Sequence, residues 1–275
     1  MSLEQAMSVI TISRGTLSGG KALAECLSKS LGYRCVDRDT IVQNAAAHGV
    51  SQDELREALE KPPTFLERLR HKKYLYVCLI QAALAEEVRN GKAVYHGHAG
   101  HLLLKRSPHI LRVRIIAPME FRLSMAQERL KMGRNEAVAY IERMDQDRIK
   151  WTQYLYGVNW CDPTLYDVVL NLEYMGIREA CAALTTLVRQ RCFEFTPEDQ
   201  AAMDDLVLGS RVRAQLALND STSHLEVEVE AERGVITVHG KISSVGDVEE
   251  MMHVAQAVPG VSAVNLDELT SPTKA

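Results

Sequence analysis

A glycine-rich turn with a lysine is the part of this sequence best suited to chemistry. Residues 15–22 read G-T-L-S-G-G-K-A and fit the pattern G-x-x-x-x-G-K, in which backbone amides surround phosphate oxygens. The turn follows the β-rich run 9–12 and precedes a helical spacing of apolar residues over 21–31, as phosphate binding at a helix N-terminus requires. We expect a nucleotide here, against the alternative of an ordinary Gly-rich turn. The expected binding residues are Gly15, Ser18, Gly19, Gly20, Lys21 and Ala22.

Lys21 is the residue of this turn that could act in catalysis. A lysine at this position contacts the β- and γ-phosphates and offsets charge during transfer. Ala22 stands where a Ser or Thr hydroxyl usually binds Mg²⁺. The sequence leaves open whether Ser18 or a carboxylate helps to hold the ion.

Asp37 and Arg38 follow a short strand candidate at 35–36, and ligands bind at such strand ends in open α/β sheets. Asp37 is interpreted equally well as a residue that positions acceptor or metal and as a turn carboxylate. Arg38 is expected on the substrate side.

Four arginines lie on two charged helices expected over 119–131 and 135–155. The planar, permanently charged guanidinium suits phosphate recognition, and a mobile helical lid of this kind would close over nucleotide and exclude water. We expect Arg122 and Arg143 to bind substrate. Alternatively, these arginines lie on solvated helix faces. The sequence pattern favours this alternative for Arg129 and Arg143, and it favours it less for Arg148.

Other chemistry-bearing residues receive simpler interpretations. His96, His98 and His101 recur in one region, but no fourth ligand follows at useful spacing, so no metal site is expected there. The aromatic residues of the second charged helix and the segment after it are expected to pack between lid and core rather than to stack on a base. They are Trp151, Tyr154, Tyr156 and Trp160.

The elements that must position these residues alternate along the chain. Strands are expected at 9–12, 35–36, 93–95, 110–116 and 168–170, and helices at 21–31, 39–60, 72–90, 119–131, 135–155 and 176–192. This alternation predicts an α/β fold with a mostly parallel sheet.

The pattern changes after a predicted junction at 195–199. A helix near 205–218, alternating strands over 225–230 and 235–238, a helix over 244–257 and a strand over 261–266 predict a small α+β unit of the order α-β-β-α-β. The expected domains are therefore residues 1–195 and residues 206–270.

Composition and charge exclude several classes. With 275 residues, 46% hydrophobic and 25% charged, the chain is neither disordered nor fibrous. Residues 206–275 carry a net charge of −5 and the remainder is near neutral, so a nucleic-acid partner is not expected.

No apolar run long enough for a transmembrane helix occurs, and the N-terminus does not read as an export signal. We therefore expect a cytoplasmic protein whose six scattered cysteines are free thiols.

Several motifs together resemble the cytidylate kinase-like family of P-loop kinases. The first is Ile10-Thr11-Ile12-Ser13-Arg14 leading into Ser18-Gly19-Gly20-Lys21, followed by Leu31-Gly32-Tyr33 and residues 36–41, V-D-R-D-T-I. The second is Asp145-Gln146-Asp147-Arg148 with Tyr154, Tyr156-Gly157, Trp160, Asp162-Pro163 and residues 166–171, Y-D-V-V-L-N. The resemblance covers residues 8–192.

The resemblance implies a P-loop kinase fold, ATP and Mg²⁺ as cofactors, and phosphoryl transfer to a small acceptor such as the nucleoside monophosphate CMP. It implies catalytic roles for Lys21, Asp37 and Arg148, the last through the family's Asp-x-x-Arg. Gly97-His98-Ala99-Gly100 departs from the family's Gly-Arg-Gly. His98 stands where an arginine would bind the acceptor phosphate, and we expect it to contact substrate.

Residues 206–270 resemble a BON domain through the Gly234 turn, the strand around Val235–Ile242 and Val258-Pro259-Gly260-Val261. This implies a regulatory or binding module that contacts a protein or small ligand. Two hypotheses follow: a small-molecule kinase with a regulatory module, or a nucleotide-binding sensor with little turnover whose C-terminal unit binds a partner. Ala22 and His98 motivate the second.

Overall fold

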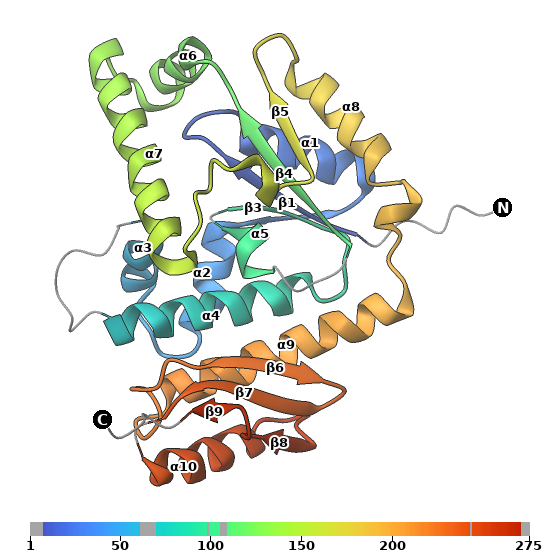
Figure 1. Ribbon diagram of the computed structural model, residues 1–275. Helices are drawn as coiled ribbons and strands as arrows, with labels where there is room; N and C mark the ends of the chain where they lie inside the picture. Colours follow the sequence, from blue (N-terminus) through green and yellow to red (C-terminus); the bar gives the residue numbers. More distant parts are fainter. Residues whose placement is uncertain (1–7, 61–69, 98, 105–108, 243, 271–275) are drawn as a thin grey trace.

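The computed structural model describes residues 8–60, 70–97, 99–104, 109–242 and 244–270. Its larger part is an α/β unit on a five-stranded sheet in the order β2-β3-β1-β4-β5 (Figure 1). All neighbouring strands of this sheet are parallel, so the predicted fold class is confirmed. The strands are β1 (Val9–Arg14), β2 (Arg34–Asp37), β3 (Ala93–His96), β4 (Ile110–Ile116) and β5 (Val168–Asn171).

Helices cover both faces of this sheet because its strands are apolar on both sides. α1 (Gly20–Leu31) and α8 (Ile177–Leu187) share one core with Ile10 and Ile12 of β1. α2 (Arg38–Ala46), α4 (Arg70–Val88) and the short α5 (Gly100–Leu103) share the opposite core with Val9. Because β1 side chains point into both cores, β1 is a central, buried strand. The phosphate turn begins at the end of this strand.

The two charged helices are present as predicted. α6 (Met119–Leu130) and α7 (Arg134–Tyr156) pack against each other around a small core of their own, formed by Leu123, Ala126, Ala137 and Ile141. Figure 1 shows the pair beside the larger sheet, to its left in that view.

The helical region predicted over 39–60 is two helices, α2 and α3 (Gln52–Glu60). Gly49 interrupts it with a φ of +86°, a left-handed conformation that glycine adopts without a steric penalty. The helix α5 was not predicted. Within the described ranges, no helix combines the length and apolar character needed to cross a membrane.

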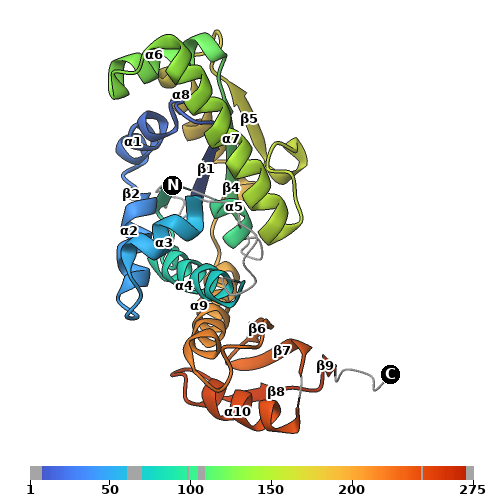
Figure 2. The ribbon, with the colours of Figure 1, turned by 90° about the vertical axis from the view of Figure 1, so that its left-hand side faces the viewer.

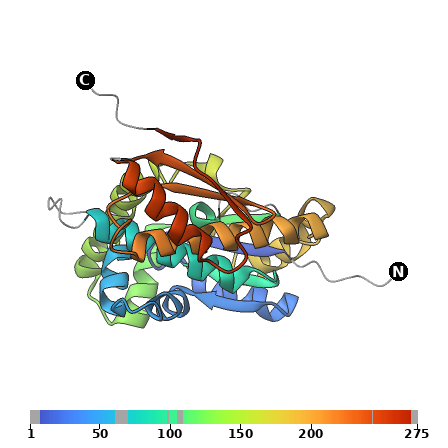
Figure 3. The ribbon, with the colours of Figure 1, turned by 90° about the horizontal axis from the view of Figure 1, so that it is seen from below.

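A smaller sheet forms the C-terminal unit. It contains β6 (Glu228–Glu232), β7 (Val235–Lys241), β8 (Ala263–Asn265) and β9 (Leu269–Thr270). β6 is antiparallel to β7, whereas β8 and β9 are parallel to it. α9 (Pro197–Leu218) and α10 (Val245–Gln256) complete this unit, and α10 lies nearest the viewer in Figure 3. The predicted α-β-β-α-β order is confirmed, with β9 as an additional strand.

α9 begins inside the segment that the sequence suggested as a junction. A capping box starts it: Thr196 Oγ1 accepts from the amide of Asp199, and the Asp199 carboxylate accepts from the amide of Thr196. Met203, Val207, Ala214 and Ala217 of α9 belong to the core around α4, while its Val212 and Leu216 belong to the core of the small sheet. Both side views place α9 between α4 and that sheet (Figures 1 and 2). One helix therefore joins the two units.

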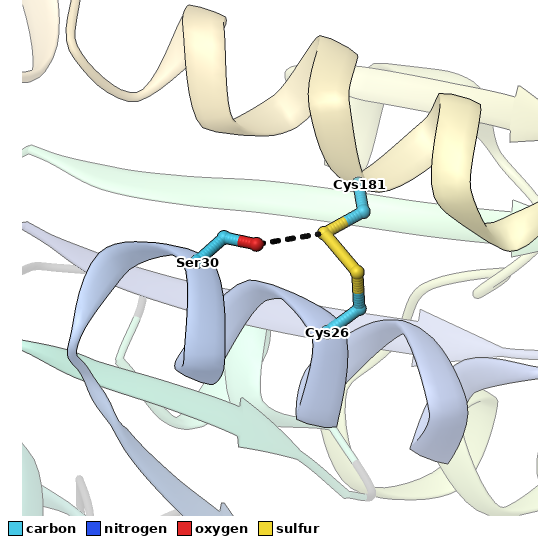
Figure 4. Close-up of a disulfide and its surroundings, with 3 residues drawn as sticks. All are labelled: Cys26, Ser30 and Cys181. Atoms are coloured by element: carbon cyan, nitrogen blue, oxygen red, sulfur yellow. Dashed lines mark hydrogen bonds between the residues drawn. A yellow bond between two sulfur atoms is a disulfide. The ribbon is translucent and has the colours of Figure 1, made fainter.

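The expectation of free thiols is wrong for two of the six cysteines. Cys26 on α1 and Cys181 on α8 form a disulfide, with their Cα atoms 6.2 Å apart, and Ser30 Oγ lies 3.6 Å from Cys181 Sγ (Figure 4). The two helices pack side by side on one face of the sheet, which brings together residues that are 155 positions apart. Cys35, Cys78, Cys161 and Cys192 are free.

Candidate active site

The phosphate turn connects β1 to α1 and leads into a helix start that carries no side-chain cap from the described part of the chain. Leu17 and Gly19 have φ values of +60° and +90°, and among the described residues no side chain caps α1 at Gly19. The first amides of a helix have no partner within it, so those of α1 are free to bind an anion, aided by the helix dipole. This is the arrangement that the motif predicted.

The side chain of Arg14 explains the glycine that precedes Lys21. A Cβ atom at Gly20 would lie 2.0 Å from Arg14 Cδ, a distance that no side chain tolerates. The stem of Arg14 therefore crosses the start of α1 directly.

Asp145 anchors the phosphate turn from α7. Its Oδ1 accepts from the Thr16 amide at 2.9 Å and from Thr16 Oγ1 at 2.8 Å. Its other oxygen pairs with Arg122 Nη2, and Arg122 Nε donates to the Thr16 carbonyl at 2.7 Å. Arg148 Nη1 donates to the Arg14 carbonyl at 3.2 Å and lies 3.4 Å from Asp145 Oδ1. The predicted Arg122 and Arg148 thus do reach the turn, and both belong to its supporting network.

A cavity of about 310 Å³ opens beside the turn. Strand ends supply one wall, and α7 supplies the other. Its charged and imidazole-bearing lining residues are Arg14, Lys21, Asp37, Arg38, Asp39, His96, His101 and Arg148. The topology thus gathers four of the predicted site residues, Lys21, Asp37, Arg38 and Arg148, at one edge of the sheet, where parallel α/β folds bind ligands.

Lys21 and Arg38 face this cavity with weak partners. Lys21 Nζ lies 3.8 Å from Glu25 Oε1, one turn along α1, and its side chain is 60% exposed. Arg38 Nη2 lies 3.8 Å from Asp39 Oδ1. Such an exposed pair as Lys21–Glu25 is weak, so Lys21 can turn toward an incoming anion.

Asp37 has a structural role that the sequence offered as one alternative. Its Oδ1 caps α2 by accepting from the Thr40 amide at 2.8 Å and from Thr40 Oγ1 at 2.9 Å. The bond from the Thr40 amide is the main reason that the pKa of Asp37 lies below its ordinary value. Asp37 is therefore charged at neutral pH and still lines the cavity.

His96 and His101 are uncharged cavity residues. Burial, aided by Arg14, lowers the pKa of His96 to about 4, and burial beside Arg112 and Arg114 lowers that of His101 to about 4. His96 Nδ1 and His101 Nε2 are buried without a hydrogen-bond partner in the part of the chain that the structure describes.

Several predicted residues lie elsewhere. Arg143 and Arg129 are exposed, and the Arg143 guanidinium lies over the Tyr140 ring at 6.0 Å rather than in the cavity. Ser18 is fully buried and its Oγ donates to the Gly15 carbonyl at 2.9 Å, so it is committed to the turn itself. His98 lies outside the described residues.

The aromatic residues divide between core and surface. Trp151 and Trp160 are buried and Tyr154 is 47% exposed. Trp160 also lines the cavity, with the Arg148 guanidinium 5.7 Å from its ring centroid.

The residues present fit a nucleotide better than a protein-held metal. The described residues contain no group of three or more His, Cys, Asp or Glu side chains placed to hold an ion. Asp37 and Asp39 are the carboxylates among those that line the cavity. One or two carboxylates suffice for Mg²⁺ that arrives with phosphates and keeps several waters, so the donor set suits an ion bound mainly by the nucleotide.

Two larger cavities, of about 1120 and 1030 Å³, lie between α4, α9 and the C-terminal unit. Neither includes a residue of the phosphate turn. Of these three cavities, the smaller one is the one lined by Lys21 of that turn.

Known families match both parts of the chain. A model of the cytidylate kinase-like family matches residues 9–174, and a model of the BON domain matches residues 204–270. The chain belongs to the cytidylate kinase-like family. It also carries a BON domain. Membership of this kinase family makes it a phosphotransferase of the kinase type.

Individual relatives agree with this assignment. The chain is 27% identical over 178 residues to a cytidylate kinase of Ignicoccus hospitalis, which covers 62% of this chain and 92% of the relative. An uncharacterized protein from Eubacterium ventriosum shares the fold with a TM-score of 0.54 and 14% identity, over 67% of this chain and 99% of that one. A shikimate kinase from Acinetobacter baumannii matches with a TM-score of 0.41 at 14% identity, over 67% and 94%, which is too weak to support an inference.

Sequence reasoning missed two residues of this site. Arg14 and Asp145 stood within the motifs that suggested the family, yet neither received a role. Asp145 carried a usable signal in its spacing of three from Arg148, which puts both on one face of α7. Arg14 carried none, because only the fold shows that its side chain turns over Gly20 into the cavity.

Proposed function

We propose that this protein transfers the γ-phosphoryl group of ATP to a small phosphorylated acceptor, with a nucleoside monophosphate such as CMP as its substrate. The observation that carries the proposal is that Lys21 of the phosphate turn lines one cavity together with Arg38 and Arg148. Electrostatic stabilisation and positioning supply nearly all of the catalysis in phosphoryl transfer. The cytidylate kinase relative supports CMP as the first acceptor to test.

The residues take distinct roles in this proposal. The amides of the turn, including those at Gly19 and Gly20, bind the ATP phosphates, and Lys21 stabilises charge on the transferring group. Arg148 faces the same cavity and adds positive charge beside the transferring group. Asp37 orients the acceptor and is the carboxylate available to Mg²⁺, which neutralises phosphate charge when bound with ATP.

A coupled assay for ADP formation tests this proposal. The full chain is supplied with MgATP and a panel of nucleoside monophosphates, each compared with the corresponding nucleoside. We expect turnover with at least one monophosphate, and loss of about a hundredfold or more in kcat for Lys21→Ala. Lys29→Ala, on the same helix but away from the turn, is the matched control and should retain wild-type turnover. Equal turnover by Lys21→Ala and Lys29→Ala would contradict the phosphate-loop assignment.

The second candidate is a nucleotide-binding sensor, favoured by the contact between the two units. Tyr74 on α4 donates from its hydroxyl to the Val227 carbonyl at 2.5 Å, and Arg213 on α9 joins Tyr74 to Glu228. This network could relay nucleotide occupancy from the kinase unit to the BON domain. ATP binding without turnover on the whole panel would favour it.

A further inference from the structure

Arg14 lines the cavity beside the phosphate turn, and within the described part of the chain no carboxylate forms an ion pair with its guanidinium. The other cationic side chains that line this cavity each have a carboxylate within 4 Å: Lys21 has Glu25, Arg38 has Asp39 and Arg148 has Asp145. Among the described residues, none pairs with the Arg14 guanidinium or accepts a hydrogen bond from it. Burial also lowers the pKa of Arg14. An unpaired charge in such a position is costly unless a ligand completes it.

The fold holds Arg14 in place although no ion pair does. Its stem passes over Gly20, where a side chain would collide with it. Its own carbonyl accepts from Arg148 Nη1 at 3.2 Å, which ties the end of β1 to α7. The stem of Arg14 thus lies against the start of α1, and the residue lines the cavity.

The surrounding charges indicate what kind of ligand fits. The described lining residues include four cations and two carboxylates, Asp37 and Asp39, so the lining itself has an excess of two positive charges. Glu25 and Asp145 lie near Lys21 and Arg148 from outside this lining. Asp37 is occupied by Thr40, and Asp39 lies near Arg38 and Arg56. A phosphomonoester carries about −1.5 to −2 charges at pH 7, so it would balance this excess.

A second orphaned group lies in the same cavity. His96 Nδ1 is buried without a partner among the described residues, and His96 lines the cavity together with Arg14. A neutral imidazole offers one nitrogen that can donate or accept a hydrogen bond to a phosphate or hydroxyl group. A guanidinium without an ion-pair partner and a buried imidazole nitrogen without a hydrogen bond belong to residues that line one cavity, which points to a ligand with several polar atoms.

We propose that Arg14 binds the phosphate of the acceptor, with His96 beside it, and thereby selects phosphomonoesters over uncharged acceptors. The inference rests on the proposed function, since it names the residue that recognises the acceptor at that same site. It also gives Arg14 the role that His98, outside the described residues, would otherwise have to fill in place of the family's arginine. A guanidinium suits this task because its fork can bind two phosphate oxygens.

Calorimetric titration of the full chain tests the proposal without relying on turnover. CMP, cytidine and inorganic phosphate are titrated separately into the protein saturated with a non-hydrolysable ATP analogue. The wild type is expected to bind CMP at least tenfold more tightly than cytidine. Arg14→Gln should weaken CMP at least tenfold and leave affinity for the ATP analogue within about threefold. The CMP affinity of Arg14→Lys should lie between those of the wild type and Arg14→Gln, because lysine retains the charge but lacks the planar fork of the guanidinium.

Controls separate recognition from folding. Arg143→Gln, an exposed arginine of α7 away from the cavity, should bind CMP like the wild type. Arg14→Gln should unfold at the wild-type temperature or above, since it removes an unpaired charge.

Equal CMP affinity of Arg14→Gln and wild type would overturn the proposal, as would equal binding of CMP and cytidine or equal weakening of CMP and the ATP analogue. Failure of the wild type to bind both CMP and inorganic phosphate would also overturn it. Tight CMP binding without phosphorylation would leave it standing and refute only the proposed kinase activity.

Discussion

Thr16 in the phosphate turn and Asp145 on α7 are joined by two hydrogen bonds to a single carboxylate oxygen, at 2.9 and 2.8 Å. This contact spans 129 residues of sequence. It links the turn that would hold phosphate to the helix that carries Arg148. A movement of α7 would therefore move the phosphate turn as well.

Removing this carboxylate should loosen the turn. In Asp145→Ala, Arg122 and Arg148 lose their anionic partner and the Thr16 amide loses its acceptor. We expect kcat/KM for ATP to fall at least tenfold and the free energy of unfolding to fall by about 1–3 kcal/mol. Steady-state kinetics and guanidinium denaturation measure the two effects. Glu142→Ala, an exposed carboxylate on the same helix, is the control, and indistinguishable behaviour of the two variants would refute the anchoring role.

Stability should fall in mild acid because two buried histidines must be protonated on unfolding. Their pKa is about 4 in the folded chain, against an ordinary value of 6.5. Between pH 6.5 and 4 the unfolded chain binds more protons than the folded one, so stability is complete above pH 6.5 and is lost as pH falls toward 4. At pH 5, each histidine should lower the free energy of unfolding by on the order of 2 kcal/mol.

Denaturant titrations at pH 7.5 and pH 5 check this expectation. The lowered pKa of Asp37 and of Asp167 places their titration below 3.8, outside this window. His96→Gln and His101→Gln should each reduce the difference in stability between the two pH values. A wild-type protein that is equally stable at both would show that neither imidazole is held neutral.

The disulfide offers a chemical test of the packing of α1 against α8. A cross-link across a separation of 155 residues restricts the unfolded chain strongly, and such bonds typically contribute about 2–4 kcal/mol. Thiol titration of the denatured, unreduced chain should therefore find four reactive cysteines, rising to six after reduction. Reduction, or the variant Cys26→Ser, should lower the unfolding temperature. Six reactive thiols before reduction would contradict the pairing.

Local pattern predicted most of the elements in this chain, because strand and helix periodicity are properties of short segments. The five parallel strands, the charged helices α6 and α7, and the phosphate turn were all predicted from such segments. The break at Gly49 was not, since residues on both sides of it have helical spacing.

What the sequence could not show depends on contacts between distant segments. The Cys26–Cys181 bond needs the adjacency of α1 and α8, which only the sheet order provides. That no carboxylate among the described residues forms an ion pair with Arg14 is likewise a property of the surrounding fold. The start of α9 was different: Thr196 and Asp199 carry the spacing of a capping box, yet the proline between them suggested a junction. Proline at the first turn is compatible with a helix.

The shared helix α9 determines where the chain can be divided. The sequence-based domains of residues 1–195 and 206–270 stay a prediction, but a chain that ends at Asp205 cuts α9 in the middle. It would lose Val207, Ala214 and Ala217, which are buried in the core around α4. Losing several buried apolar side chains at once should cost about 3–5 kcal/mol or more.

A chain that ends at Asn219 retains them, and it exposes Val212 and Leu216 instead. We therefore expect residues 1–219 with Val212→Ser and Leu216→Gln to bind the ATP analogue like the full chain. Residues 1–205 should unfold at a clearly lower temperature. Circular dichroism and calorimetry on both fragments measure the difference, and equal unfolding temperatures would show that the kinase unit does not need the C-terminal half of α9.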